Sequence, residues 1–291
     1  MDPSIAPAAP LPDEWQDWIT GNVVRGCADD EMVGVMTGAG FDAAYARTAI
    51  SVVRAMTERV RREQPSALAV YTADPIRLPP SAAATAADRS VAFGFVLRNP
   101  NVALLQGLLS EDECDRLIRL SAGKLRRSEV VDQTTGGFTV SQVRTSQGTW
   151  FERGENAVVQ RLEARIAALT GVPVDHGEPL QILHYGTGGE YLPHHDYFDP
   201  RDAGTPAQLE AGGQRIATVV VYLNDVARGG ETGFPELDLT VSARRGSAVY
   251  FEYRNARGEL DSRCLHAGNP VLAGEKWIAT KWLRERPYLR P

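Results

Sequence analysis

Residues 185–198 read Tyr-Gly-Thr-Gly-Gly-Glu-Tyr-Leu-Pro-His-His-Asp-Tyr-Phe and contain the triplet His194-His195-Asp196. In an extended strand His194 and Asp196 leave the same face, because they lie two residues apart, and His195 leaves the other. Two imidazoles and one carboxylate on one side of an ion form the facial triad of non-haem Fe(II) oxygenases, which keeps positions open for a co-substrate and O2. His266 is the natural third ligand, although a polar surface strand would also carry such a triplet.

A second feature is the run 276–283, Lys-Trp-Ile-Ala-Thr-Lys-Trp-Leu, which alternates as a strand does. One face of that strand would carry Lys276, Ile278, Thr280 and Trp282. A buried ammonium is costly without an opposite charge, and the carboxylate of a ligand would supply that charge. A lysine that reaches out from a strand end is the alternative. The position of Lys276 shortly after His266 favours the buried lysine.

Several further motifs follow one another in a recognisable order: Glu113-Cys114-Asp115, Arg144-Thr145-Ser146, Gly212-Gly213-Gln214-Arg215, Tyr222-Leu223-Asn224-Asp225-Val226, Gly229-Gly230-Glu231-Thr232 and the block 266–282. With these motifs the chain resembles, from about residue 104 to its C-terminus, the catalytic domain of the prolyl 4-hydroxylases, which are Fe(II)- and 2-oxoglutarate-dependent dioxygenases. Chance rarely keeps so many motifs in order.

The resemblance implies a role for individual residues. It implies that Fe(II) is bound by His194, Asp196 and His266. It implies that the distal carboxylate of 2-oxoglutarate is bound by Lys276 with Thr232 as its hydroxyl partner, and that Tyr185 lines the same pocket. Candidates for the substrate channel are Tyr191, Arg215, Trp282 and Arg144. The implied cofactors are Fe(II), 2-oxoglutarate and O2, with ascorbate as a possible addition.

Three positions bear on the chemistry. Related halogenases lack a carboxylate at the position of Asp196, so its presence implies hydroxylation of an unactivated C–H bond, with release of succinate and CO2. Asn269 stands where many relatives have Cys, and Arg284 stands where a relative with a defined peptide groove has His. These two departures leave the metal assignment intact and put the identity of the substrate in doubt.

Composition limits the class of protein. The chain has 291 residues, 43% of them hydrophobic, and a net charge of -6. That length allows one sizeable core and a smaller second unit, and an acidic chain does not suggest nucleic-acid binding. Three cysteines without a Cys-x-x-Cys pair favour a reducing compartment, hence the cytoplasm. The N-terminus shows neither the pattern of a secretory signal nor that of a membrane span, so we expect no membrane partner.

The pattern along the chain predicts an α+β protein. We expect a flexible tail at 1–12, a unit of three short helices at 13–62, a Pro/Ala-rich linker at 63–90 and a dioxygenase domain at 91–291. In that domain a capping box at Ser110 opens one helix, and a second runs over 156–169. Strands are expected at 180–185, 191–197, 216–223, 247–253 and 276–283. Helices followed by short strands fit a double-stranded β-helix, or jelly roll, braced by helices, in which 216–223 is central because it is apolar on both faces.

Three functions remain open from the sequence. The leading one is hydroxylation of a prolyl residue in a peptide or protein, with a Gly-rich loop at 132–143 closing over the substrate. The second keeps the chemistry but acts on a free amino acid or a small biosynthetic intermediate. An open groove would favour the peptide, whereas Arg215 or Arg284 facing the iron would favour the small acid. The third is a jelly-roll module that binds or senses without catalysis.

Overall fold

The computed structural model describes residues 11–24, 27–63, 71–131, 137–140 and 144–289. It divides the chain into two compact units, Met1–Val70 and Tyr71–Pro291. In the described residues no helix is both long and apolar enough to cross a membrane. Each unit has a hydrophobic core of its own.

The first unit consists of three helices, α1 (Asp13–Val24), α2 (Asp29–Gly38) and α3 (Ala43–Glu63). Apolar residues at steps of three and four along these helices meet in a core that includes Ile19, Met32, Met36 and Ile50. The described residues of this unit therefore form the three helices that the periodicity predicts, and α2 ends at Gly38.

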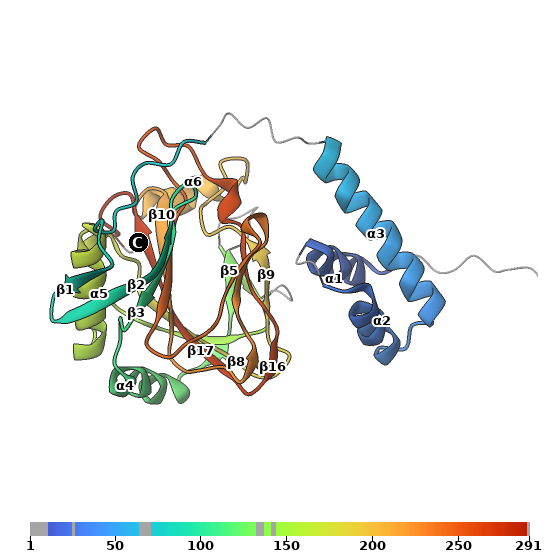
Figure 1. The fold of residues 1–291 in the computed structure, drawn as a ribbon, viewed down its shortest axis with the longest axis horizontal. Helices are drawn as coiled ribbons and strands as arrows, with labels where there is room; N and C mark the ends of the chain where they lie inside the picture. Colours follow the sequence, from blue (N-terminus) through green and yellow to red (C-terminus); the bar gives the residue numbers. More distant parts are fainter. Residues whose placement is uncertain (1–10, 25–26, 64–70, 132–136, 141–143, 290–291) are drawn as a thin grey trace, which may run out of the picture. The chain divides into compact units, whose positions relative to one another are not determined.

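The second unit is built on a nine-stranded antiparallel sheet (Figure 1). From one edge to the other its strands are β1 (Ala83–Ala86), β2 (Arg89–Leu97), β3 (Val102–Gln106), β14 (Ala248–Glu252), β10 (Arg215–Tyr222), β17 (Lys276–Arg284), β8 (Leu180–Tyr185), β7 (Gln147–Phe151) and β4 (Arg126–Arg127). The apolar strand β10 is the middle one, as a strand that is buried on both faces should be.

A smaller sheet faces the large one. Its order is β13 (Leu239–Val241), β12 (Thr232–Phe234), β15 (His266–Gly268) and β9 (Tyr191–His194). Two further pairs are β11 (Arg228–Gly229) with β16 (Val271–Ala273), and β5 (Glu129–Val131) with β6 (Phe138–Val140). Residues of both sheets, among them Tyr222, Phe234 and Phe251, share one apolar core. This arrangement confirms the predicted jelly roll.

Helices brace the outer face of the large sheet (Figure 1). α4 (Glu111–Ala122) and α5 (Ala157–Thr170) pack apolar residues against it, and a short α6 (Thr205–Glu210) precedes β10. The predicted capping box is present, because Ser110 Oγ accepts from the Glu113 backbone N–H at 3.2 Å and the Glu113 carboxylate accepts from the Ser110 N–H at 2.9 Å. Glu113 also binds Arg165 of α5 at 2.8 Å, which ties the two helices together.

The structure differs from the sequence prediction in three places. The segment 71–90, expected in the linker, belongs to the catalytic unit, where it contributes strand β1 and the buried side chains of Leu78 and Ala86. The strand expected at 191–197 ends at His194, so Asp196 lies in a bend after β9. The loop expected at 132–143 includes β6, while residues 132–136 and 141–143 lie outside the described residues.

Candidate iron and 2-oxoglutarate site

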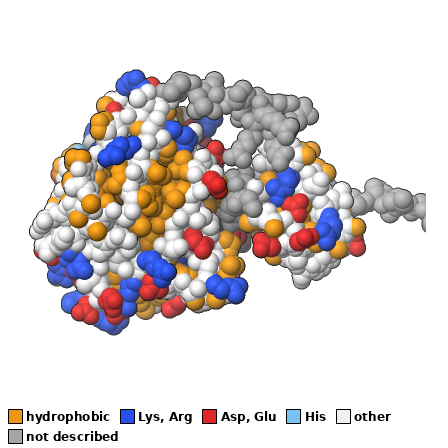
Figure 2. Space-filling model, viewed as in Figure 1, with side chains coloured by type: hydrophobic (Ala, Val, Ile, Leu, Met, Phe, Trp, Pro, Cys, Tyr) orange, Lys and Arg blue, Asp and Glu red, His pale blue; other side chains and the backbone are white. Residues whose placement is uncertain are grey.

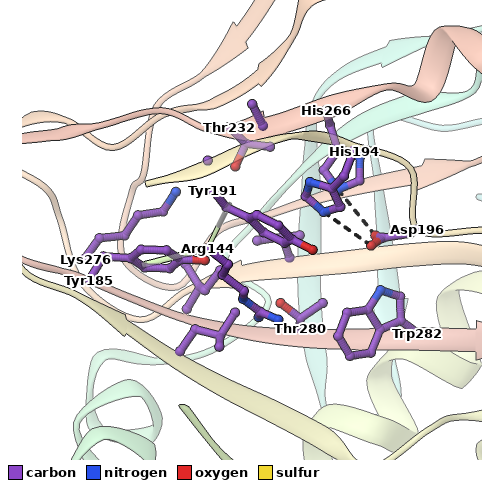
Figure 3. Close-up of a pocket in the computed structure, with 15 residues that line it drawn as sticks. Arg144, Tyr185, Tyr191, His194, Asp196, Thr232, His266, Lys276, Thr280 and Trp282 are labelled. Atoms are coloured by element: carbon purple, nitrogen blue, oxygen red, sulfur yellow. Dashed lines mark ion pairs between the residues drawn. The ribbon is translucent and has the colours of Figure 1, made fainter. Parts of the chain in front are cut away.

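Three metal-binding side chains meet at the smaller sheet. His194 of β9 and His266 of β15 are direct partners in the antiparallel register. The Nε2 atoms of His194 and His266 lie 3.6 Å and 3.4 Å from the carboxylate oxygens of Asp196. One ligand atom from each of the three residues falls within 4.8 Å of the others. These side chains converge at one end of the pocket in Figure 3.

Both imidazoles are oriented by the backbone. Nδ1 of His194 lies 2.9 Å from the Leu192 carbonyl oxygen, and Nδ1 of His266 lies 3.0 Å from that of Cys264. A carbonyl can only accept, so Nδ1 carries the proton in each ring and Nε2 keeps a lone pair for a metal. His195 binds the Ser262 carbonyl instead and is no part of the cluster.

The electrostatics suit a divalent cation. Burial, and to a lesser degree the neighbouring His266, lower the pKa of His194 to about 4, so His194 is neutral at pH 7. Burial alone would raise the pKa of Asp196, but the two imidazoles bring it well below its usual range. Thr218 Oγ1 donates to the Asp196 carboxylate at 2.7 Å and fixes its orientation. Two imidazoles and one carboxylate are a donor set that fits Fe(II).

The other end of the pocket holds Lys276 (Figure 3). Lys276 is only 2% exposed and pairs in register with Tyr185 of β8. Among the described residues Lys276 has no hydrogen-bond or ion-pair partner. Burial lowers its pKa to about 8, although the nearby charge of Glu231 acts to raise it. Thr232 accepts a hydrogen bond from Tyr222 at 2.8 Å, so its own hydroxyl hydrogen can go to a ligand. A bound dicarboxylate would give the Lys276 ammonium the ion-pair partner that it lacks among the described residues.

Most of the predicted substrate residues line this pocket. Tyr191 stacks on His194 with ring centroids 3.7 Å apart, and the Arg144 guanidinium lies 4.8 Å from the Tyr191 ring centre. Arg144 also donates to Gln181 Oε1 at 2.7 Å. Trp282 of β17 lies near the metal-binding end. The pocket therefore brings together Lys276, Thr232, Tyr185, Tyr191, Trp282 and Arg144 with the three metal-binding residues.

Arg215 is not brought into the pocket. Its guanidinium binds both carboxylate oxygens of Glu178, at 2.7 Å and 2.9 Å, and donates to the Asp196 backbone carbonyl at 3.2 Å. It also lies 4.1 Å from the ring centre of Trp282. Arg215 thus supports the wall of the pocket and the loop of a metal-binding residue from behind, instead of contacting the substrate channel as expected.

Two supporting residues were missed from the sequence. Glu178 binds Arg215 and also Arg284, the latter at 2.9 Å, and nothing in its local sequence marks it. Thr218 holds the Asp196 carboxylate. It is a lone hydroxyl in the apolar strand β10, and such a residue signals a buried hydrogen-bond partner.

Known proteins share these features. A model of the 2OG-Fe(II) oxygenase superfamily matches residues 180–284. Probable prolyl 4-hydroxylase 7 of Arabidopsis thaliana is 40% identical over 209 residues, which are 66% of this chain and 65% of that protein. Prolyl 4-hydroxylase 5 of the same plant is 41% identical over 63% of this chain and 68% of its own length. The chain thus spans about two thirds of the length of these curated relatives.

A solved structure agrees with this assignment. The 2OG complex of the viral collagen prolyl hydroxylase from Paramecium Bursaria Chlorella virus-1 is similar with a TM-score of 0.50 and 30% identity, covering 63% of this chain and 95% of that one. The reading as a non-catalytic binding module is therefore set aside. The chain belongs to the prolyl 4-hydroxylase family of 2OG-Fe(II) oxygenases, and it is a 2-oxoglutarate-dependent dioxygenase.

Proposed function

We propose that this dioxygenase hydroxylates a prolyl residue in a peptide or protein. When bound, iron and 2-oxoglutarate supply the oxidative chemistry with O2, in which one oxygen atom goes to succinate as 2-oxoglutarate loses CO2 and the other goes to the prolyl residue. The Nε2 atoms of His194 and His266 and the carboxylate of Asp196 would hold the iron. Lys276 and Thr232, at the far end of the same pocket, would hold the distal carboxylate of 2-oxoglutarate.

The pairing of both arginines with Glu178 is the observation that carries the proposal. A free amino acid brings a carboxylate that needs a cation near the iron. Arg215 and Arg284 were the candidates for that cation, but both bind Glu178. They lower the pKa of Glu178, although burial alone would raise it. Both guanidinium groups are thus bound to Glu178 and neither lines the pocket, so an uncharged peptide segment suits the pocket better.

Arg144 supports a second candidate function, the hydroxylation of a small acid. Its guanidinium lines the pocket beside Tyr191, where it could bind the carboxylate of a free amino acid or a small biosynthetic acid. A guanidinium has only N–H donors, so the same group is equally suited to a peptide carbonyl.

A product assay separates the two candidates. The full-length protein is incubated with Fe(II), 2-oxoglutarate, ascorbate and O2, together with either a proline-rich peptide blocked at both ends or free proline. We expect a gain of one oxygen by mass spectrometry in the peptide and none in free proline. Oxygen gained by free proline alone would overturn the peptide assignment in favour of the small acid.

Two conditions for activity belong to the proposal. Ascorbate is expected to sustain turnover by returning oxidised iron to Fe(II), and the enzyme is expected to work in the cytoplasm. The three cysteines support the second point, because none of the three forms a disulfide with another.

A further inference from the structure

Asp196 is held in place differently from the two histidines of the metal site. His194 and His266 lie in paired strands, and each imidazole binds the backbone carbonyl two residues earlier in the chain. Asp196 lies in a bend after β9, outside the strands of both sheets. Its carboxylate accepts a hydrogen bond at 2.7 Å from the hydroxyl of Thr218, 22 residues later. The orientation of this candidate ligand therefore depends on a residue of the large sheet.

The contact between Asp196 and Thr218 lies inside the protein. Figure 2 shows Lys, Arg, Asp and Glu side chains spread over the face of the molecule that it draws. Asp196 is in contrast only 6% exposed, Thr218 is fully buried, and Tyr253, which contacts Thr218, is 1% exposed. Buried hydroxyl groups of native proteins have hydrogen-bond partners, so each hydroxyl here depends on its neighbours in the chain.

The hydrogen bonds among these three residues run in one direction. A carboxylate that binds a metal is ionised and can only accept, so Thr218 donates its one hydroxyl hydrogen to Asp196 Oδ2. Tyr253 Oη lies 3.1 Å from Thr218 Oγ1. Because the Thr218 hydrogen is already used, Tyr253 is the donor in this second bond. Burial and the charge of Asp196 raise the pKa of Tyr253, so its phenol keeps the hydrogen that it donates.

Tyr253 is itself anchored to the strand that carries Thr218. Its backbone N–H donates to the Ile216 carbonyl at 3.1 Å, and its own carbonyl accepts from the Asp261 N–H at 2.8 Å. Ile216 lies two residues before Thr218 in β10. The ring of Tyr253 packs in the core that the two sheets share, with its centroid 5.9 Å from that of Phe251. A phenol held by these contacts can fix the orientation of the hydroxyl that it binds.

We propose that Tyr253 is a positioning residue of the iron site, because it holds the Thr218 hydroxyl in the orientation that donates to Asp196. The proposal rests on the proposed function, in which Asp196 would bind the iron. Tyr253 is not one of the three candidate metal ligands and acts through Thr218. Groups that hydrogen-bond a metal ligand typically change metal affinity by about 10–100-fold when they are removed, and Tyr253 reaches the ligand through such a group.

Anaerobic calorimetric titration of the full-length protein with Fe(II) tests the proposal without turnover. Tyr253→Phe removes only the hydroxyl and should raise the Kd for Fe(II) about fivefold, which is the usual worth of one neutral hydrogen bond. Thr218→Val removes the bond to the carboxylate itself and should raise the Kd about 10–100-fold. Thr218→Ser keeps a hydroxyl at this position and should restore binding to nearly the wild-type Kd.

A double variant shows whether Tyr253 acts through Thr218. Thr218→Val combined with Tyr253→Phe should bind Fe(II) no more weakly than Thr218→Val alone, because the hydroxyl that Tyr253 holds is already gone.

Tyr250→Phe is the matched control, since it removes another buried phenol hydroxyl close by in the chain. Tyr250 is fully buried, belongs to the core beneath the helices, and donates to Glu252 Oε1 at 2.6 Å. Its loss should lower the urea midpoint of unfolding and leave the Kd for Fe(II) unchanged. A role of Tyr253 in stability alone would give the same result in Tyr253→Phe.

The failures are distinguishable. A folded Tyr253→Phe protein with the wild-type Kd for Fe(II), or an equal rise of that Kd in Tyr250→Phe, would overturn the positioning role while the iron site stands. Fully additive effects in the double variant would show that Tyr253 does not act through Thr218, and would overturn it as well. If the wild-type protein itself fails to bind Fe(II), the metal assignment of the proposed function is wrong and this inference falls with it.

Discussion

Each imidazole of the triad hydrogen-bonds the carbonyl of the residue two positions before it in the chain, which fixes Nε2 as the metal-binding atom. We predict that His194→Ala and His266→Ala each lose Fe(II) binding and 2-oxoglutarate turnover, because a facial site with one ligand fewer holds the ion poorly. Calorimetric titration with Fe(II) under anaerobic conditions measures the loss. His195→Ala is the control and should bind Fe(II), since His195 bonds Ser262 away from the cluster. Normal turnover by a folded His266→Ala protein would contradict the assignment of these three residues as metal ligands.

Lys276 forms no ion pair with any described residue, although the charge of Glu231 lies nearby, so we predict that it dominates the affinity for 2-oxoglutarate. Removing one partner of a buried ion pair costs about 3–5 kcal/mol. Lys276→Ala should therefore raise the Kd for 2-oxoglutarate by on the order of a hundredfold to several thousandfold, with metal binding nearly unchanged. An unchanged Kd would place the distal carboxylate elsewhere.

The lowered pKa of Lys276 adds a pH dependence with a defined sign. Its pKa is about 8 without the ligand, so the ammonium that binds a carboxylate is present below that pH and is lost above it. At about pH 9 the Kd for 2-oxoglutarate should be about tenfold higher than at pH 7. Lys276→Arg stays charged and should show a flat profile over this range. A flat profile in the wild type would show that Lys276 does not bind the co-substrate through its charge.

At this scale the sequence predicts residues whose role follows from spacing or from the family motif, such as His194 and Lys276. It does not predict a partner that lies far away in the chain. Arg215 matched a substrate position, yet its environment is set by Glu178, 37 residues earlier, which also binds Arg284, 106 residues later. Only the folded register of the strands brings these three charges together.

At the scale of elements, Glu178, just before β8, joins two neighbouring strands, β10 through Arg215 and β17 through Arg284. We predict that Glu178→Ala lowers the free energy of unfolding by about 3–5 kcal/mol, because it leaves two buried guanidinium groups without an acid. Urea titration measures this. Glu210→Ala at the exposed end of α6 is the control and should change little. A Glu178→Ala protein of wild-type stability would show that the ion pairs of Glu178 with Arg215 and Arg284 do not stabilise these strands.

The same carboxylate gives a pH dependence of stability. The pKa of Glu178 is lowered in the folded state, so its contribution is present above the usual glutamate pKa and is lost as pH falls through the folded value. The stability of wild type and Glu178→Ala should therefore converge on acidification. Agreement at low pH and divergence at neutral pH is the expected pattern.

Elements with a clear period were predictable, and short or alanine-rich ones were not. β8, β10 and β17 each have six or more residues of strand pattern and appear close to their predicted bounds. The strands of the smaller sheet have three or four residues, too few to show a period. β1 was taken for linker because its sequence, Ala-Ala-Thr-Ala, has little strand propensity and gains its place by pairing with β2.

At the scale of the whole molecule, the boundary between Val70 and Tyr71 predicts where the chain can be cut. A chain that begins at Tyr71 should bind Fe(II) and turn over 2-oxoglutarate, because every residue of the site lies in the second unit. A chain that begins at Val91 should fail to fold, since it lacks β1 and the bond from the Arg77 N–H to buried Glu252 at 2.8 Å. Circular dichroism and turnover of both proteins check this. A folded, iron-loaded but inactive chain from Tyr71 would show that the N-terminal helices help to build the site.

The central claim is that one pocket couples oxidation of 2-oxoglutarate to hydroxylation of a prolyl residue. Turnover under isotopically labelled O2, with a blocked proline-rich peptide, tests it most directly by mass spectrometry of both products. The account predicts one labelled oxygen in succinate for each labelled oxygen on a peptidyl proline, and loss of both signals in His266→Ala. Labelled succinate with no oxygen on proline at any peptide concentration would contradict the account, because the chemistry would then be intact and the prolyl substrate wrong.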